Sequence, residues 1–358
     1  MRGSRRIAVT GAGGIGGVNF INAAREASSY FIVGLDHDEY YLQLPRADAR
    51  VRSPRHDDPG FIDFLREVVS KYGVEFLHPQ PEVEVEVVAL NRERVGAKTL
   101  LPSSTAVEVA RDKWRSYETL RRAGVSVPDT ELYSPEAVEH VLRKYGKAWI
   151  RARKGAGGRL SLPINSVEEA EAWVKLWRLR GAASLEDFIV QEYLPGRDVA
   201  WDSLWFKGKL VASYARERLR YIFPHLAPSR VTGTPTVART IKDAEVNEVA
   251  EAAVRAVDPC PHGFYCVDLK FNEEGRPAVT EVNVKAHTTL GLWGFIAQRV
   301  FKLPRHYNMV YLYLQLGLDG EVEELPEKYD IYPEATVMRH VDAGLLVNYG
   351  GGWRRVQY

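Results

Sequence analysis

Two predicted strands in the last third of the chain carry carboxylate and carboxamide side chains, one on the first strand and two at alternate positions on the second. The first reads G-F-Y-C-V-D-L-K-F and contains Asp268, and the second reads A-V-T-E-V-N and contains Glu281 and Asn283. Side chains two residues apart on a strand point to the same face, so Glu281 and Asn283 lie together. The intervening residues 272–275, N-E-E-G, predict a turn, and hence a hairpin that lays Asp268 beside the other two.

The three side chains of this hairpin would suit a metal ion. Two carboxylates and a carboxamide are hard oxygen ligands, the set that Mg²⁺ prefers when it holds a nucleotide triphosphate. The alternative is a surface hairpin whose acids are solvated. Other elements upstream favour the metal site, because they occur in a consistent order.

The composition is that of a globular protein long enough for two or three domains. The chain has 358 residues, 45% of them hydrophobic and 27% charged. A net charge of +1 gives no electrostatic footprint for nucleic acid or an anionic membrane. The two cysteines, Cys260 and Cys266, form neither a C-x-x-C pair nor a disulfide framework and fit a reducing cytosol.

The chain also lacks the patterns of a membrane or secreted protein. No stretch reaches the roughly 20 apolar residues that span a bilayer, and the basic start runs into glycines rather than an apolar signal segment. We therefore expect a cytoplasmic protein with no nucleic-acid or membrane partner.

The first hundred residues alternate between strands and helices. Strands are predicted over 6–10, 30–35, 74–78 and 97–101, with helices ending near 27 and spanning about 61–72 and 82–94. This alternation is typical of a small parallel α/β domain.

A glycine-rich turn joins the first predicted strand to its helix. Gly11, Gly13 and Gly16 fit G-x-G-x-x-G and Asp36 closes the next strand, so the dinucleotide fingerprint is met in full. The same glycines could instead let the helix approach the strand closely, or bind another anion there. On this pattern alone both readings stay open.

A second glycine-rich loop, K-G-A-G-G over 154–158, lies between two predicted strands. Its backbone amides can wrap phosphate oxygens, and Arg151, Arg153, Lys154 and Arg159 supply positive charge. The spacing is not that of a Walker loop, and a simple turn is the alternative.

Two further segments connect strands in the middle of the chain. Residues 191–198, Q-E-Y-L-P-G-R-D, can offer backbone groups to an adenine edge and Asp198 to ribose hydroxyls, or they form an ordinary strand corner. Residues 221–240 are polar, without clear periodicity, and predict a long loop of the kind that often forms a lid.

The order of these pieces resembles that of the ATP-grasp superfamily. The pieces are D-K-W at a helix start, W-I-R-A-R-K-G-A-G-G, V-Q-E-Y-L-P-G-R-D, and V-D-L-K with T-E-V-N-V-K. The resemblance covers about 112–301 and is closest to carbamoyl-phosphate synthetase large-subunit halves and related carboxylate–amine ligases. Four ordered motifs are far more specific than either glycine loop.

The resemblance implies an α/β protein with a pre-ATP-grasp domain and a two-lobed ATP-grasp fold. The pre-ATP-grasp domain, parallel α/β and Rossmann-like, is expected over 1–102. The two α+β lobes are expected over 103–185 and 186–318. Residues 319–358 form a C-terminal extension to which the resemblance gives no role.

The resemblance also assigns ATP and Mg²⁺, with Mn²⁺ as a substitute, to named positions. The expected nucleotide-binding residues are Lys113, Arg151, Lys154, Gly155, Gly157, Gly158, Gln191, Glu192, Leu194 and Asp198. They are similar, in this order, to two phosphate-binding cations, a loop over the phosphates, an adenine hinge and an acidic ribose ligand. Arg151 stands where Lys is usual, and Asp198 where Glu is usual.

The metal positions match Asp268, Glu281 and Asn283, and the expected catalytic cations are Arg151 and Lys285. Lys285 stands near the transferring phosphate, where the family often has Arg. The first metal position is Gln in some synthetases and Asp in peptide-type ligases.

The acceptor site is expected at residues outside these motifs. Arg216, Arg218 and Arg220 follow one another at period two, so they share a strand face and either grip an anionic substrate or form a solvated edge. His287, Thr288 and Thr289 lie two to four residues after Lys285 and would line the same pocket. The turn containing Gly11 and Gly13 would line an acceptor cleft rather than hold NAD, because that is its usual place in the pre-ATP-grasp domain.

The implied activity is that of a ligase that forms a C–N bond. A carboxylate attacks the γ-phosphate of ATP to give an acyl phosphate and ADP, and an amine then displaces phosphate to give an amide. The expected partners are a small-molecule carboxylate and an amine. A homodimer is compatible with this expectation. Two other classes stay open: an NAD(P)-dependent oxidoreductase that uses the N-terminal turn, and a non-catalytic ATP-binding module.

Overall fold

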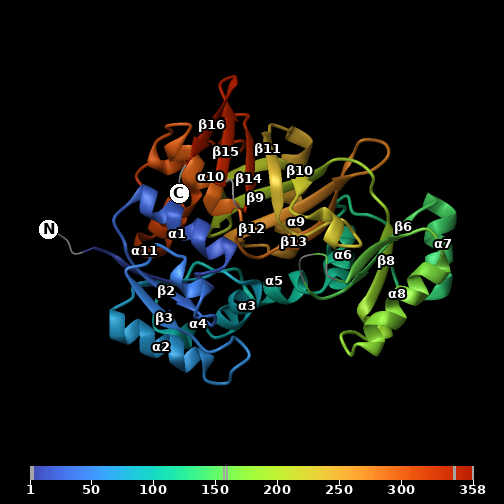
Figure 1. Ribbon diagram of the computed structural model, residues 1–358, viewed down its shortest axis with the longest axis horizontal. Coiled ribbons are helices and arrows are strands. Elements are labelled where there is room, and N and C mark those ends of the chain that lie inside the picture. Colours follow the sequence, from blue (N-terminus) through green and yellow to red (C-terminus); the bar gives the residue numbers. More distant parts are fainter. Residues whose placement is uncertain (1–3, 156–157, 159, 342–343, 357–358) are drawn as a thin grey trace.

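The structure, a computed structural model, describes residues 4–155, 158, 160–341 and 344–356. Within these residues the strands form a parallel sheet of four strands, an antiparallel sheet of four and an antiparallel sheet of eight (Figure 1). None of the helices in the described ranges is both long and apolar enough to cross a membrane. The α/β class predicted from the sequence is confirmed.

The N-terminal sheet is parallel, in the strand order β3-β2-β1-β4. Its strands are β1 (Arg6–Thr10), β2 (Phe31–Asp36), β3 (Ala49–Arg52) and β4 (Phe76–Pro79). The helices are α1 (Ile15–Ala27), α2 (Phe61–Tyr72), α3 (Glu82–Leu90) and α4 (Arg92–Val95), with the 3₁₀ turn η1 (Tyr41–Gln43). The strand predicted over 97–101 is wrong, since only a single bridge joins Lys98 to Phe76 there.

The small sheet is antiparallel and has the order β5-β8-β6-β7. Its strands are β5 (Thr130–Leu132), β6 (Ala148–Ala152), β7 (Ser161–Ile164) and β8 (Phe188–Glu192). Helices α7 (Pro135–Tyr145) and α8 (Val167–Leu179) pack on it, and each begins at a serine cap whose hydroxyl accepts from an amide of the first turn. This sheet extends past residue 185, because β8 lies between β5 and β6.

Helices α5 (Ser104–Ala110) and α6 (Lys113–Arg122) lead from the N-terminal sheet toward the small sheet (Figure 1). Asp112 caps α6 by accepting from Trp114 N at 3.0 Å and also pairs with Arg153 at 2.7 Å. The start of α6 is therefore fastened to the end of β6.

The large sheet has the order β13-β12-β9-β10-β11-β14-β15-β16. These strands are β9 (Asp198–Phe206), β10 (Lys209–Tyr221), β11 (Pro235–Ile241), β12 (Gly263–Phe271), β13 (Pro277–Asn283), β14 (Thr336–His340), β15 (Gly344–Tyr349) and β16 (Gly352–Val356). The helices are α9 (Ala244–Val257), α10 (Leu290–Arg299) and α11 (Met309–Asp319), with the 3₁₀ turns η3 (Pro224–Leu226) and η4 (Arg305–Tyr307). The long loop predicted over 221–240 is wrong from Pro235 on, because β11 begins there. The C-terminal extension continues the sheet through β14, β15 and β16.

The hydrophobic core divides unevenly among the three sheets. One cluster runs from Phe20 of α1 through Trp293 of α10 to Tyr214 of β10 and Val337 of β14, so the N-terminal and large sheets share buried side chains. The small sheet and helices α7 and α8 have a separate cluster of their own, which includes Ile150. The small sheet is thus the part of the fold least bound to the rest by apolar packing.

Candidate active site

A cavity of about 390 Å³ lies between the small and the large sheet. Most of the residues predicted to bind nucleotide, metal or acceptor line it: Arg151, Gly158, Gln191, Glu192, Leu194, Asp198, Arg216, Arg218, Asp268, Glu281, Asn283, Lys285, His287 and Thr288. The cavity is large enough for a small-molecule ligand.

The acidic hairpin forms one wall of this cavity. Strands β12 and β13 pair antiparallel with Asp268 opposite Glu281 and Cys266 opposite Asn283, so the predicted hairpin is present. In the turn, Gly275 N donates to Asn272 O at 3.1 Å with a φ of 77° at Gly275. Next to the turn, Leu269 pairs with Val279, and a β-bulge between Asp268 and Leu269 then shifts the register by one residue. This shift places Glu281 rather than Thr280 opposite Asp268.

Glu281 is held by the two cations predicted to bind phosphate. One carboxylate oxygen lies 3.3 Å from Lys113 Nζ and the other 2.8 Å from Arg151 Nη2. Burial alone would raise the pKa of Glu281, but Lys113 and Arg151 outweigh it and lower the pKa below its usual value. Lys113 Nζ also donates to Gly155 O at 2.7 Å, which ties the glycine loop to the same group.

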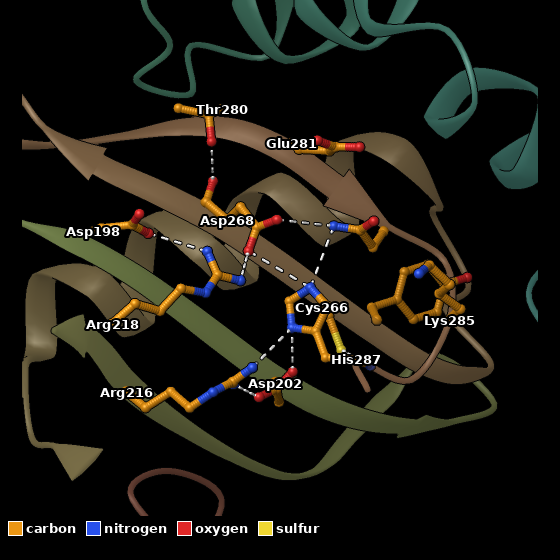
Figure 2. A network of polar contacts seen from close by, with 12 residues as sticks. Asp198, Asp202, Arg216, Arg218, Cys266, Asp268, Thr280, Glu281, Lys285 and His287 are labelled. Carbon is orange, nitrogen blue, oxygen red and sulfur yellow. Dashed lines mark hydrogen bonds and ion pairs between the residues drawn. The ribbon is translucent and has the colours of Figure 1, made fainter. Parts of the chain in front are cut away.

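Asp268 is held by a different set of side chains (Figure 2). Arg218 donates to one of its oxygens, and Asn283 Nδ2 donates to the other at 3.3 Å. Burial opposes ionisation here as well, yet Arg218 and the neighbouring His287 lower the pKa of Asp268 to about 2. Asp268 is therefore a carboxylate at any physiological pH.

Arg218 also forms an ion pair with Asp198, the residue predicted to bind the ribose. Asp198 accepts from Arg218 Nη1 at 3.1 Å and from the Tyr221 hydroxyl at 2.7 Å. Arg218 thus bridges Asp198 and Asp268, two residues to which the family resemblance gives different ligands. Tyr221 was not identified as a site residue from the sequence.

The predicted adenine hinge lies along β8 and just beyond it. Gln191 is buried and donates to Thr130 Oγ1 at 2.9 Å, while the backbone amide of Glu192 donates to Asp129 O at 2.8 Å. Leu194 is buried, and it lines the cavity together with Tyr193. The hinge therefore offers an apolar wall beside an extended backbone.

The glycine loop is described only in part, because Gly157 lies outside the described residues. Lys154 and Gly155 are exposed. A Cβ built on Gly158 would lie 3.1 Å from Val231 O, so this end of the loop touches the segment between β10 and β11. That segment lines the cavity at 231–235, as the predicted lid would.

A buried network extends from the hairpin into the floor of the cavity. His287 lies with Nδ1 2.7 Å from Asp202 and Nε2 3.6 Å from Asp268 (Figure 2). Asp202 is fully buried and ion-paired with Arg216. Sequence reasoning missed Asp202, although a lone acid in the apolar run V-A-W-D-S-L-W-F was an available signal.

The side chains of the three arginines predicted to share one face of β10 do not all point to the cavity. Arg216 and Arg218 point into the site, but Arg220 is exposed and does not line the cavity. The pairing of β10 with β11 shifts register between Arg218 and Arg220. This irregularity breaks the period-two alternation on which the prediction for Arg220 relied.

Lys285 lies at the edge of the cavity and is paired across the fold. Its Nζ is 3.8 Å from Glu82 at the start of α3, so the N-terminal domain helps to place it. Thr288 O accepts from Asn19 Nδ2 of α1 at 2.8 Å. Neither Glu82 nor Asn19 carried a motif that would have revealed these contacts.

The N-terminal glycine turn is filled by the protein itself. A Cβ on Gly11 would lie 2.4 Å from Pro81, and one on Gly13 would lie 2.3 Å from Tyr41 O. Gly13 N donates to Asp36 at 2.9 Å, so the acid that would accept from a dinucleotide ribose instead holds the turn. Neither glycine lines the large cavity.

The donor set of the hairpin fits a hard divalent ion. Asp268 and Glu281 are ionised oxygen donors opposite each other on one pair of strands, and the carboxamide of Asn283 lies next to Asp268. Glu281 is ion-paired with Lys113, which the family resemblance assigns to phosphate, and Asp268 is ion-paired with Arg218, which the period-two spacing suggests as a substrate ligand.

Comparison with known proteins agrees with this geometry. Residues 110–289, half of the chain, match the family model described as an ATP-grasp domain. A curated relative, the glutamate–LysW ligase ArgX of Sulfurisphaera tokodaii, is 26% identical over 224 residues, covering 61% of this chain and 76% of the relative.

Similar folds occur among solved structures, at 15% identity in each case. An L-amino acid ligase from Bacillus licheniformis gives a TM-score of 0.67 with 95% of this chain and 80% of the other covered. A biotin carboxylase from Campylobacter jejuni gives 0.69 with 94% and 75% covered. A Staphylococcus aureus N5-carboxyaminoimidazole synthetase in complex with ADP gives 0.65 with 95% and 83% covered. The chain belongs to the ATP-grasp family, whose cofactors are ATP and Mg²⁺.

Proposed function

We propose that this protein is an ATP-dependent ligase that joins a small-molecule carboxylate to an amine through an acyl phosphate. The family supports the use of ATP, and the relatives named as a glutamate–LysW ligase and an L-amino acid ligase support the ligase class. One observation carries the proposal for this site: Glu281, expected to hold the metal, is ion-paired with Lys113 and Arg151, expected to hold phosphate, and it lines the same cavity as the hinge residues.

The nucleotide would lie along the hinge with its phosphates toward the hairpin. Gln191, Glu192 and Leu194 would contact adenine, and Asp198 would contact the ribose once Arg218 yields one of its bonds. Lys113 and Arg151 would turn from Glu281 to the phosphates, with Lys154, Gly155 and Gly158 covering them. These cations offset the negative charge that grows during transfer.

The metal would be held by Asp268, Glu281 and Asn283, and it would supply charge neutralisation at the phosphate oxygens. Side chains of the protein would orient the substrates. Lys285 stands at the edge of the cavity, where it can orient the carboxylate or the transferred phosphate. His287, Thr288, Arg216 and Arg218 line the acceptor end.

The N-terminal turn has a structural role in this proposal. Gly11 and Gly13 are occupied by Pro81 and Tyr41, and Asp36 by the turn itself, so an NAD(P)-dependent oxidoreductase gains no support from the geometry. A non-catalytic module is disfavoured because the expected positions are intact: Asp268, Glu281 and Asn283 offer oxygen donors for a metal, and Lys113 and Arg151 supply cations for phosphate. We further propose a cytoplasmic location, which two cysteines without a disulfide framework support. We also propose a homodimer, because the biotin carboxylase domain of the Hydrogenobacter thermophilus 2-oxoglutarate carboxylase, a solved structure of similar fold, is described as a dimer.

An ADP-release screen tests the function. Pools of amino acids, other carboxylates, bicarbonate and amines are supplied with Mg²⁺ and ATP, and ADP release is expected only with an acceptor. Amino acids come first, because the two ligase relatives are named for them. Saturable ATP binding without acceptor-dependent ADP would favour the non-catalytic module, and NAD binding without ATP binding would favour the oxidoreductase.

A further inference from the structure

A second, much smaller cavity adjoins the acceptor end of the site. Its volume is about 10 Å³, and three of the residues that line it also line the large cavity: Arg216, Pro235 and Thr289. Its outer wall includes Trp293 of α10 and Arg339 of β14. The volume is that of about one water molecule or one carboxylate oxygen.

Two buried polar atoms at this cavity have no hydrogen-bond partner among the described residues. They are Nε of Arg216, which is 1% exposed, and Oγ1 of Thr289, which is 4% exposed. Buried polar groups are nearly always paired in folded proteins. The guanidinium N–H and the hydroxyl are both able to donate, so an anionic oxygen would satisfy them together.

The charges around the cavity point to the same kind of ligand. Arg216 is paired with Asp202, yet burial and the positive charges of Arg218 and Arg339 lower the pKa of Arg216 to about 9. Helix α10 begins at Leu290, directly after Thr289, so its positive end faces the same place. Thr289 makes no side-chain cap for this helix, which leaves its hydroxyl available.

We propose that this cavity anchors a carboxylate of the amino-acid substrate, one that is not phosphorylated in the reaction. Arg216 Nε and the Thr289 hydroxyl donate to one of its oxygens, and the Arg339 guanidinium supplies the second cation. The proposal rests on the proposed ligase function and specifies its substrate class. It also gives the C-terminal extension a role, because Arg339 comes from β14.

The position suits a substrate that carries two acidic groups. Arg216 Nη2 lies 3.3 Å from His287 Nδ1, and the other nitrogen of that ring lies 3.6 Å from Asp268. The anchor and the proposed metal ligands are thus separated by a single imidazole ring. A short amino dicarboxylate spans such a separation, with one carboxylate anchored and the reacting group beside the metal ligands.

The test compares amino acids with matched compounds that lack the α-carboxylate. L-Glutamate, L-aspartate and L-2-aminoadipate are paired with 4-aminobutyrate, β-alanine and 5-aminovalerate, each with ATP, Mg²⁺ and the pooled carboxylates and amines. ADP release is expected to be about 100-fold faster with the first set, because a site built to bind an ionic group rejects ligands that lack it. Equal rates with both sets, or release only with acids outside both sets, would overturn the proposal.

Substitutions at the small cavity test whether its residues bind the carboxylate. Arg339→Met and Thr289→Val should each raise KM for the active amino acid about tenfold or more, while Arg339→Lys restores part of the affinity and the ATP Kd does not change. Arg354→Met, an exposed arginine of β16, is the matched control and should behave like the parent. Folding of each variant is checked by thermal melting. KM values within twofold of the parent for both Arg339→Met and Thr289→Val would show that the cavity holds only water.

Failure of the ligase function is distinguishable from failure of the anchor. If ATP binds but no pool releases ADP, the proposed function is wrong. Direct titration of L-glutamate into the ATP-bound protein then decides the anchor. Binding that Arg339→Met weakens and Arg354→Met does not would support it, and the absence of binding would overturn it.

Discussion

The carboxylate of Glu281 lies 3.3 Å from the ammonium of Lys113, so a residue proposed to bind the metal and a residue proposed to bind phosphate form an ion pair. Glu281 belongs to the large sheet, whereas Lys113 begins a helix fastened to the end of the small sheet. The pair keeps both charges compensated in a buried position until other charges replace them. Charge balance is therefore built into the site before any ligand arrives.

Replacing Glu281 tests the metal assignment. Glu281→Gln keeps the shape and removes the negative charge, so we expect ADP release to fall by at least about 100-fold, because the metal would lose an anionic ligand. Steady-state ADP release with a working acceptor measures this. Glu273→Gln, in the exposed turn of the same hairpin, is the control and should be unaffected. A folded Glu281→Gln protein with near-normal turnover would contradict the assignment.

Replacing Arg218 tests whether its guanidinium compensates the charge of Asp268 in the way that a bound Mg²⁺ would. Arg218→Met leaves Asp198 and Asp268 without their shared partner, and we expect a loss of about 3 kcal/mol in the free energy of unfolding. Mg²⁺ should restore more stability to this variant than to the parent, because it can compensate Asp268. Urea denaturation with and without Mg²⁺ measures both effects. Arg220→Met, two residues along the same strand and exposed, should change stability by less than about 0.5 kcal/mol.

Substitutions in the glycine turn separate packing from ligand binding. Gly13→Ala places a methyl group 2.3 Å from Tyr41 O, so we expect it to cost about 2 kcal/mol of stability. Asp36→Ala removes the acceptor of Gly13 N and should cost about 1–3 kcal/mol. Neither should change the ATP Kd measured by titration on the folded fraction. Gly14→Ala, whose Cβ would meet nothing closer than 3.4 Å, is the control. NAD binding that is lost in a folded Asp36→Ala protein would refute the structural role.

Glu84 makes stability depend on pH. Burial raises the pKa of Glu84 to about 7, from an ordinary value of 4.5, and one of its carboxyl oxygens has no partner among the described residues. The folded state therefore prefers the protonated acid, and the stability present below about pH 4.5 is lost as the pH rises through about 7. The loss is about 3 kcal/mol for this group.

Glu84→Gln removes that titration, so its unfolding free energy should vary less between pH 4.5 and 7 than that of the parent. Denaturant unfolding at a series of pH values measures the difference. Glu93→Gln, an exposed acid in α4, should keep the parent's slope. Parallel pH profiles for the parent and Glu84→Gln would refute the assignment.

Local patterns predicted the parts of the site that one element can specify. The period of two along β13 and the turn at 272–275 predicted a hairpin that lays Asp268 beside Glu281 and Asn283, and the structure has this hairpin. The pairing of Asp268 with Glu281 itself depends on a β-bulge that the pattern did not predict. The four ordered motifs predicted the family and the fold class, and both are confirmed. The roles of the individual site residues stay predictions that the variants above test.

Contacts between distant elements could not be predicted in the same way. The pairs Asp202–Arg216 and Glu82–Lys285 depend on how strands and domains come together, and neither leaves a local spacing. The exposure of Arg220 depends on a register shift in a neighbouring strand that was itself read as loop. The glycine turn fits the dinucleotide pattern for a packing reason, because close approach of Pro81 and Tyr41 requires the same residue type.

The separate core of the small sheet has a consequence for motion. Since α7, α8 and their sheet bury their apolar side chains among themselves, they form a cooperative unit that can rotate or open without disturbing the rest. The ion pair of Arg151 with Glu281 is one of the polar links that cross to the large sheet, and a nucleotide would compete for it. Amide hydrogen exchange should therefore be faster in this unit than in the two sheets that share a core, and an ATP analogue bound at the hinge should slow it.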